Sequence, residues 1–181
     1  METPAASARQ VELLEAAYRY VLAHGLGDLS LRPLASAIGS SPRVLLYLFG
    51  SKDGLLRALL ARARADELAL LGRARGTTGL EPVARLVWSW LAAPGHRALL
   101  MLWTEAYARS LLEPDGPWAG FAADTVRDWL DVLAAAQPPS GRDEIRQTAV
   151  LAVLRGALLD LLATGDVDRT TAAVEAVLNA P

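Results

Sequence analysis

The chain of 181 residues contains no cysteine and only two histidines. Without cysteine it can form neither a disulfide nor a thiolate metal site, and it has no cysteine nucleophile. Two histidines leave little for metal binding or acid-base chemistry. We therefore expect no metal and no cofactor. Because the sequence shows no catalytic constellation and no phosphate-binding glycine loop, we expect that the protein is not an enzyme.

The sequence also lacks a signal that would direct it out of the cytoplasm. Its first residues, METPAASARQ, contain no apolar segment of a signal peptide, so we expect a cytoplasmic protein. The stretch 148–163 is apolar or glycine at 13 of 16 positions, but it contains Arg155 and Asp160. A bilayer span needs about twenty apolar residues, so we expect no membrane partner.

Composition and periodicity favour an all-α fold. Apolar residues make up 52% of the chain and charged residues 21%, and β-branched residues are sparse. Apolar residues recur at helical spacing, which predicts helices at about 8–24, 31–38, 42–49, 52–71, 81–92, 95–112, 118–136, 142–163 and 168–179. The segment 73–82 is rich in glycine and threonine and is the best internal boundary. We expect an N-terminal helical part at 1–50, a connecting helix at 51–72 and a second helical domain at 73–181.

Two short helices follow the first one and are joined by a glycine and two serines. Ser30 and Ser41 stand at the expected helix starts, and Pro33 and Pro42 fall in the first turns, where a missing N–H does no harm. Gly39 ends the first of the two helices. This arrangement is typical of a helix-turn-helix. Residues 1–64 hold eight Lys or Arg against five Asp or Glu, which weakly favours a polyanion partner for this part.

The segment SLRPLASAIGSSPRVLLYLFGSKDGLL resembles the helix-turn-helix of TetR-family transcriptional regulators. The residues in register with the family pattern are Ser30, Leu34, Ala35, Ile38, Gly39, Ser41, Leu45, Tyr47, Phe49, Ser51, Lys52 and Leu55. The resemblance covers residues 8–60. It implies a cytoplasmic homodimeric repressor that binds a palindromic double-stranded DNA operator and is released by a small-molecule effector held in the C-terminal domain.

The DNA-binding residues follow from helical spacing and from this resemblance. A recognition helix presents a few exposed side chains to base edges in the major groove. The expected contacts are Ser30, Arg32, Ser41, Arg43, Val44, Tyr47 and Lys52. Lys52, the only lysine, begins a helix, where a cation is unfavourable unless a phosphate binds there. The alternative is that these cations are ordinary solvated surface residues, whereas Leu34, Ala35, Ile38, Leu45 and Phe49 are expected in the core.

All five tryptophans lie beyond residue 80, and they suggest an apolar effector pocket between helices. The candidate ligand-binding residues are Trp88, Met101, Trp103, Tyr107, Trp118 and Phe121. The alternative is that these side chains belong to the core. A helix-turn-helix protein that binds DNA without responding to a ligand also remains open.

The apolar stretch 148–163 is hydrophobic nearly all round, which favours burial of one face in a second subunit. Small residues would let a partner helix approach closely. The candidate dimer-interface residues are Ala149, Ala152, Val153, Gly156 and Ala157. The alternative is the central helix of a monomeric core.

Overall fold

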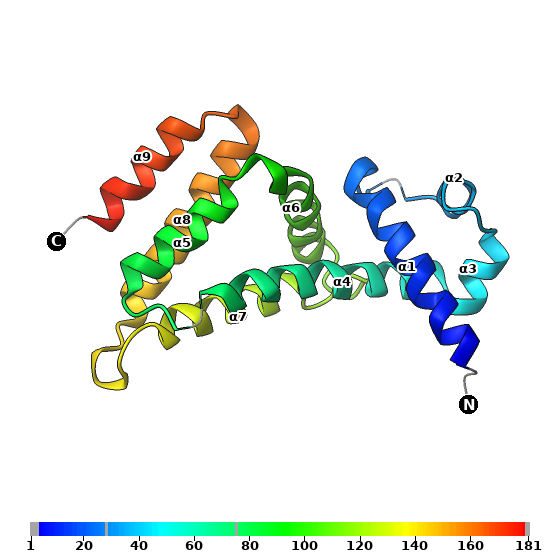
Figure 1. Cartoon of the computed structure of the whole chain (residues 1–181), viewed down its shortest axis with the longest axis horizontal. Coiled ribbons are helices and arrows are strands. Elements are labelled where there is room, and N and C mark those ends of the chain that lie inside the picture. The colour runs from blue at the N-terminus through cyan, green and yellow to red at the C-terminus, as the bar shows by residue number, and fades with distance from the viewer. Residues whose placement is uncertain (1–3, 28, 75, 180–181) are drawn as a thin grey trace. The chain divides into compact units, whose positions relative to one another are not determined.

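The computed structural model describes residues 4–27, 29–74 and 76–179. Within these ranges the chain is helical and has no strand, which confirms the predicted all-α fold. The α-helices are α1 (Pro4–His24), α2 (Leu31–Ala37), α3 (Pro42–Phe49), α4 (Lys52–Arg73), α5 (Leu80–Leu91), α6 (Arg97–Leu112), α7 (Phe121–Ala135), α8 (Glu144–Thr164) and α9 (Val167–Leu178) (Figure 1). Two 3-10 turns, η1 (Pro94–His96) and η2 (Pro139–Gly141), precede α6 and α8.

The described residues fall into two compact units. Unit 1 contains the residues up to 65 together with 98–122, and unit 2 contains 66–97 together with the residues from 123 onward. Helix α4 is continuous and passes from unit 1 into unit 2.

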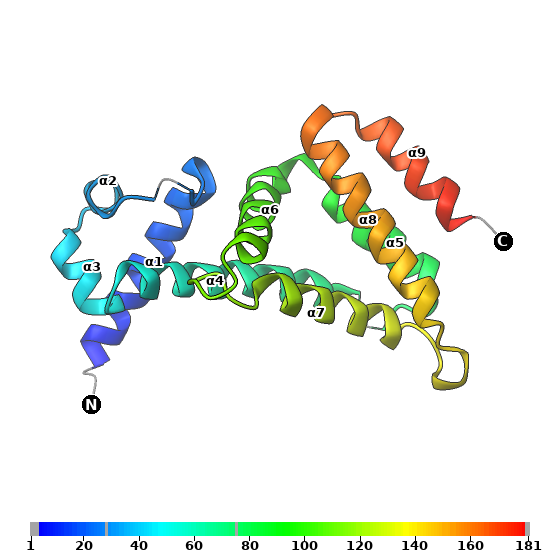
Figure 2. The ribbon, with the colours of Figure 1, turned by 180° about the vertical axis from the view of Figure 1, so that it is seen from behind.

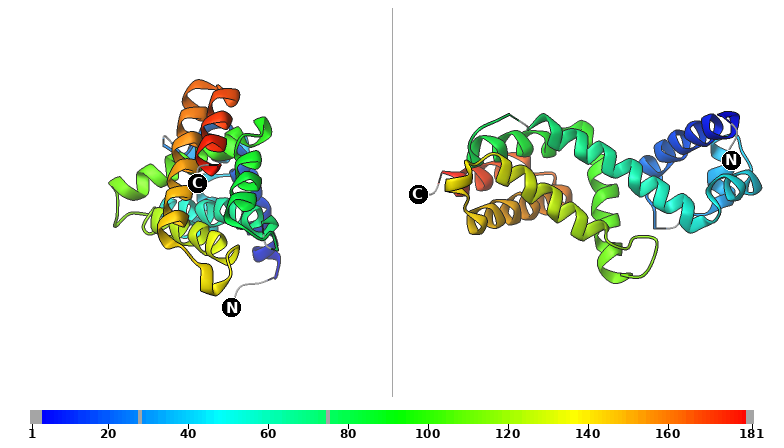
Figure 3. Two further views of the ribbon diagram at one scale, coloured as in Figure 1. Left: turned by 90° about the vertical axis from the view of Figure 1, so that its left-hand side faces the viewer. Right: turned by 90° about the horizontal axis from the view of Figure 1, so that it is seen from below.

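The core of unit 1 includes the apolar faces of α1 to α4. Helices α1, α2, α3 and the start of α4 lie together at the right of the right-hand view in Figure 3. The predicted core residues Leu34, Ala35 and Leu45 are buried, and Ile38 and Phe49 are half-buried. Leu29 is also buried, as expected if it packs beside the first turn of α2.

In unit 2, α5, α8 and α9 lie side by side (Figure 2). Leucines of α8, including Leu154 and Leu158, are buried in this unit. Polar contacts also join the helices. The Trp88 Nε1–H of α5 donates to Thr171 Oγ1 of α9 at 2.9 Å, and Arg85 pairs with Glu175 at 2.9 Å.

Helices α6 and α7 begin later than the sequence predicts. Helix α6 begins at Arg97, because the turn Pro94–His96 is a 3-10 turn. Helix α7 begins at Phe121 and not at residue 118, because Gly120 has a positive φ of 78° that interrupts the helical backbone. Trp118 therefore lies in the turn before α7, where its carbonyl accepts a hydrogen bond from Phe121 N at 3.1 Å.

Helix α8 has 21 residues and is longer than its apolar stretch. By length and composition alone it could cross a membrane, so the expectation that this segment is too short was wrong. One such helix is weak support for a span, because the core helix of a globular protein passes the same test. The burial of its leucines within unit 2 is what a core helix requires.

Candidate nucleic-acid interface

Helix α3 owes its bounds to local capping. Ser41 Oγ accepts a hydrogen bond from Val44 N at 3.3 Å, and Pro42 occupies the first turn. Gly50 ends the helix with a φ of 77°, a backbone conformation that side chains disfavour. The helix is thus two turns long and fixed at both ends, as the sequence predicts.

The two faces of α3 differ sharply in exposure. Leu45 is only 1% exposed and anchors the helix in unit 1. On the opposite side, Arg43, Val44, Leu46 and Tyr47 are exposed, and Tyr47 is exposed to 81%. Three of these four were predicted as DNA contacts, and Leu46 adds an apolar group. A cation, an aromatic hydroxyl and aliphatic groups on one short helix suit base edges and thymine methyls.

Two contacts that the sequence analysis missed hold α3 in place. Gln10 Nε2 of α1 donates a hydrogen bond to the carbonyl of Leu48 at 2.8 Å. Gly54 of α4 lies so close to α3 that a Cβ atom there would be 2.0 Å from Phe49 O. A glycine in the first turns of a long helix is unfavourable, and this was a signal that the position needs space.

Ser30, Arg32 and Lys52 line one open hollow of unit 1, which we call the Lys52 hollow. The other residues that line it are Gly27, Leu29, Leu31 and Pro42. Ser30 precedes α2 with an extended backbone, and its side chain makes no capping hydrogen bond. Ser51 Oγ accepts from Gly54 N at 2.9 Å and starts α4, so that Lys52 is its first residue.

Chemically, the Lys52 hollow suits a phosphate. Two cationic residues and a serine line it, and Lys52 lies at a helix start, where exposed N–H groups attract anions. Of the predicted DNA-binding residues, Ser41 is half-buried and caps α3, so its hydroxyl has a structural contact as well.

The candidate ligand-binding residues do not all lie in one unit. Trp103 and Tyr107 of α6 are ring neighbours, with centroids 5.2 Å apart. Trp118 and Phe121 are buried in the same unit 1, whereas Met101 is 50% exposed. Trp88 belongs to unit 2 and contacts Thr171 there.

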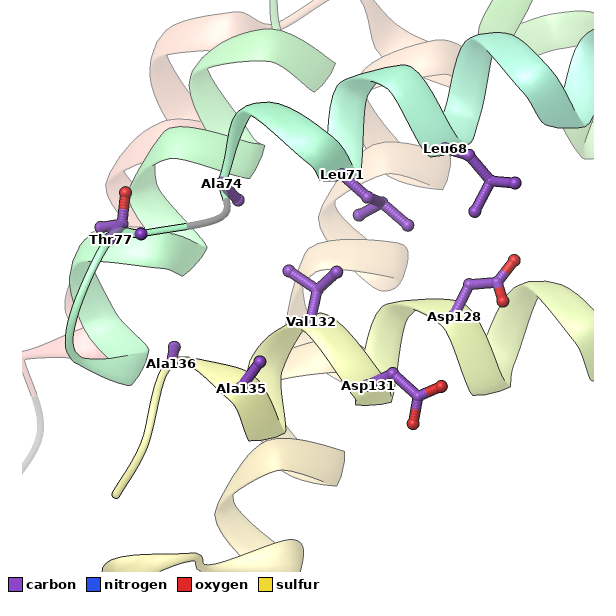
Figure 4. Close-up of a pocket in the computed structure, with 10 residues that line it drawn as sticks. Leu68, Leu71, Ala74, Thr77, Asp128, Asp131, Val132, Ala135 and Ala136 are labelled. Atoms are coloured by element: carbon purple, nitrogen blue, oxygen red, sulfur yellow. The ribbon is translucent and has the colours of Figure 1, made fainter. Parts of the chain in front are cut away.

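A pocket of about 220 Å³ lies in unit 2 between the end of α4 and α7. Figure 4 shows Leu71 of α4 and Val132 of α7 pointing toward one another, with Asp128 and Asp131 along α7. The full lining is Leu68, Leu71, Ala74, Gly76, Thr77, Asp128, Asp131, Val132, Ala135 and Ala136. None of the six predicted ligand-binding residues belongs to this set. Among the residues that the structure describes, no cluster of His, Asp and Glu could hold a metal ion.

The candidate dimer-interface residues share one face of α8. Ala149, Ala152 and Gly156 are exposed, and Val153 and Ala157 are half-buried. A Cβ atom added at Gly156 would meet nothing within 4 Å. The small-residue face is therefore uncovered in the single chain, while the leucines on the other side of α8 are buried.

Known proteins resemble this chain at two levels. Residues 13–59 match the family model described as bacterial regulatory proteins, tetR family. Among curated proteins, no sequence matches the chain.

Solved structures share the fold over nearly the whole chain. A transcriptional regulator from Rhodococcus sp. Rha1 has a TM-score of 0.78 and 18% identity, covering 93% of each chain. A TetR transcription regulator from Haloarcula marismortui has a TM-score of 0.74 and 19% identity, covering 94% of each chain. The multidrug binding protein EbrR, complexed with proflavin, has a TM-score of 0.67 and 26% identity, covering 93% of this chain and 97% of EbrR.

The family model covers α2, α3 and the start of α4, the elements that carry the exposed face and the Lys52 hollow. The solved regulators share the remaining helices as well. TetR-family regulators are DNA-binding transcription factors and not enzymes. Residues 13–59 are therefore identified as a tetR-family helix-turn-helix domain, and the described chain has the fold of TetR-family transcriptional regulators.

Proposed function

We propose that this protein is a cytoplasmic homodimeric repressor that binds a palindromic operator and is released by a small hydrophobic ligand. The observation that carries the proposal is the exposed face of α3 beside a hollow lined by Arg32 and Lys52. In this proposal residues 1–50 bind DNA, residues 51–72 form the connecting helix, and residues 73–181 bind the effector and dimerise.

In this proposal Arg43 reads a base edge and Val44 and Tyr47 add contacts in the major groove. Arginine bonds bidentately to guanine O6 and N7, and such a pair is worth about 1–3 kcal/mol of discrimination. Arg32, Lys52, Ser30 and Ser41 bind the phosphates that set the register of α3.

The uncovered face of α8 supports dimerisation. Small side chains at Ala149, Ala152 and Gly156 allow close approach of a second helix, and their exposure leaves that face free for one. With a second copy the two α3 helices bind major grooves one helical turn, about 34–36 Å, apart. This assignment makes α8 an interface helix and requires no membrane partner.

For the effector we propose a contact surface on α6 around Trp103 and Tyr107, together with Trp118 and Phe121. EbrR binds proflavin, an aromatic cation, so proflavin is a suitable first probe for this chain. That Trp88 and Met101 contact the same ligand stays a prediction. A ligand that binds more tightly to the form of the protein that does not bind DNA shifts the equilibrium toward that form. The shift equals the difference between its binding free energies for the two forms, typically about 1–3 kcal/mol.

One observation favours a second candidate, a regulator that does not respond to ligands. Trp103, Trp118 and Phe121 are each at most 9% exposed, as core residues are. The two candidates differ in a thermal-denaturation experiment with proflavin and other apolar compounds. A concentration-dependent rise in the unfolding midpoint supports the effector, whereas no shift up to the solubility limit supports the ligand-independent regulator.

The DNA-binding part is tested by binding to the DNA upstream of the protein's own coding sequence, over a series of salt concentrations. We expect binding tighter than to random duplex and a steep decrease with salt, because cations replace counterions on the phosphates. Equal, salt-insensitive affinity for both duplexes would contradict the proposal.

A further inference from the structure

The loop between α1 and α2 is held by a carboxylate from α6. Leu26 N donates a hydrogen bond to Glu105 Oε2 at 2.8 Å. A Cβ atom at Gly25 would lie 3.3 Å from the same oxygen, and one at Gly27 would lie 2.7 Å from Glu105 Oε1. Both carboxylate oxygens of Glu105 therefore rest against the backbone of residues 25–27, within unit 1.

The local backbone explains why this loop needs an acceptor. Gly25 ends α1 with a φ of 80°, so that the chain turns and Leu26 leaves the helical hydrogen-bond ladder. The Leu26 side chain is 2% exposed, which places its amide at the edge of the core. An N–H that is shielded from water and has no acceptor is unfavourable, and a carboxylate is a strong acceptor for it.

A glycine is needed at position 27 because a larger residue would leave no room for the Glu105 carboxylate. Its φ is not in the left-handed region, so the backbone itself would accept another residue. A side chain there would meet Glu105 Oε1 and come within 3.4 Å of Arg109 Nη2, one turn further along α6. The acidic side chain of Glu105 and the basic side chain of Arg109, one turn apart on α6, thus lie close to this glycine.

The same loop leads directly into the Lys52 hollow. Gly27 lines the hollow, and Ser30 and Arg32 follow it within a few residues. On the other side of the contact, Glu105 lies between Trp103 and Tyr107 in the sequence of α6. One carboxylate therefore joins the helix of the aromatic pair to the segment that presents the phosphate-binding side chains.

We propose that Glu105 is a positioning residue for DNA binding, which fixes the α1–α2 loop to α6 so that a displacement of either is transmitted to the other. The proposal rests on the proposed function, since it concerns how the DNA-binding segment is held. If a change in α6 alters the affinity for DNA, then bound DNA must alter the stability of α6 by the same free energy. DNA bound at the helix-turn-helix should therefore stabilise α6, and this effect should pass through Glu105.

Amide hydrogen exchange of the full-length protein, with and without DNA, measures this transmission. The probe is a duplex selected from a random-sequence library by the wild-type protein. Wild type is compared with Glu105→Ala, which removes the acceptor, and with Glu105→Gln, which keeps a carbonyl acceptor. Glu12→Ala is the matched control, because it removes an exposed carboxylate of unit 1 whose contact is Arg9.

We expect DNA to slow exchange at residues 42–49 and at 97–112 in wild type and in Glu12→Ala. In Glu105→Ala the Leu26 amide exchanges faster, the protection of 97–112 by DNA is lost and that of 42–49 remains. Glu105→Gln restores the protection of 97–112. If Glu105→Ala does not fold, Gly27→Ala replaces it, because its methyl group displaces the carboxylate and should give the same loss.

Undiminished protection of 97–112 in Glu105→Ala, or an equal loss in Glu12→Ala, would overturn the role of Glu105 while leaving the proposed regulator intact. A wild-type protein that protects 42–49 but never 97–112 would also overturn it. If the library yields no bound duplex, the proposed regulator fails first, and the positioning role fails with it.

Discussion

At the scale of single residues, Arg43 and Lys52 are both exposed cations of unit 1, but they occupy different places. Arg43 lies on the exposed face of α3, whereas Lys52 begins α4 and lines the hollow. A side chain that reads bases affects some sequences only, and one that binds phosphate affects all of them. The two residues should therefore be separable by experiment.

Replacing Arg43 by alanine should relax sequence preference. We expect discrimination at one base pair of each half-site to fall by about 1–3 kcal/mol, because a bidentate contact to guanine is lost. Competition between the selected duplex and single-base variants measures this. A loss of affinity that is equal for every duplex would show that Arg43 does not read a base.

Replacing Lys52 by alanine should weaken binding to all duplexes alike. The slope of log affinity against log salt should become shallower by about one per protomer, since one phosphate contact is removed. Lys52→Arg keeps the charge and is the matched control. An unchanged slope in Lys52→Ala would mean that Lys52 does not contact a phosphate.

The sequence predicted those residues whose place follows from a local sequence pattern. Leu45 and the exposed side chains around it follow from the 3.6-residue period of α3, and Ser41 from its place before Pro42. Gln10 and Glu105 had no such signal, because their partners Leu48 and Leu26 are backbone groups 38 and 79 residues away. Contacts of this kind depend on how helices pack, which periodicity does not specify.

At the scale of elements, an ion pair ties the start of α5 to the start of α8. Arg146 Nη2 lies 3.1 Å from Glu81 Oε1. A hydrogen bond from its own backbone N–H and then the Arg146 guanidinium hold the pKa of Glu81 below its ordinary value, although burial opposes the shift. Because the folded carboxyl has the lower pKa, its stabilising effect exists above the ordinary glutamate pKa of about 4.3. This effect is lost as the pH falls through the pKa of the folded state.

Glu81→Gln should accordingly be less stable than wild type at pH 7, by about 0.2–1 kcal/mol for so exposed a pair. The difference should shrink as the pH falls from about 5 to 3, where the wild-type carboxyl becomes protonated. Urea denaturation at several pH values measures it. A difference that stays constant across this range would contradict the assigned ion pair.

The presence of each helix was easier to predict than its first and last residues. All the predicted segments are helical, but α7 starts at Phe121 because Gly120 takes a positive φ, a choice that the apolar pattern does not reveal. Helix α8 starts at Glu144, and not at residue 142 as predicted, because Asp143 caps it, its carboxylate accepting from Arg146 N at 2.9 Å.

At the scale of the whole molecule, the proposed dimer depends on one uncovered face of α8. Gly156→Arg places a long charged side chain in the centre of that face and has open space in the single chain. We expect a folded monomer by analytical ultracentrifugation, with greatly weakened operator binding. Gly156→Ala is the control and should remain dimeric, with a slightly more stable helix. A dimeric Gly156→Arg protein would place the interface elsewhere.

The two compact units could not be read from the linear sequence. Residues 98–122 join unit 1 although about thirty residues of unit 2 precede them in the chain. Turn-rich strings mark where helices end, but they do not tell which helices pack together. The proposed division into DNA-binding, connecting and effector parts stays a prediction about function.

As a dimer, this chain is proposed to bind a specific palindromic sequence. Selection of bound duplexes from a random-sequence library by the wild-type protein, followed by sequencing, tests it most directly. We expect an inverted repeat whose half-site centres are about 10 base pairs, or a multiple of that, apart. Recovery of unenriched sequences, or of a single half-site without its inverted copy, would contradict it.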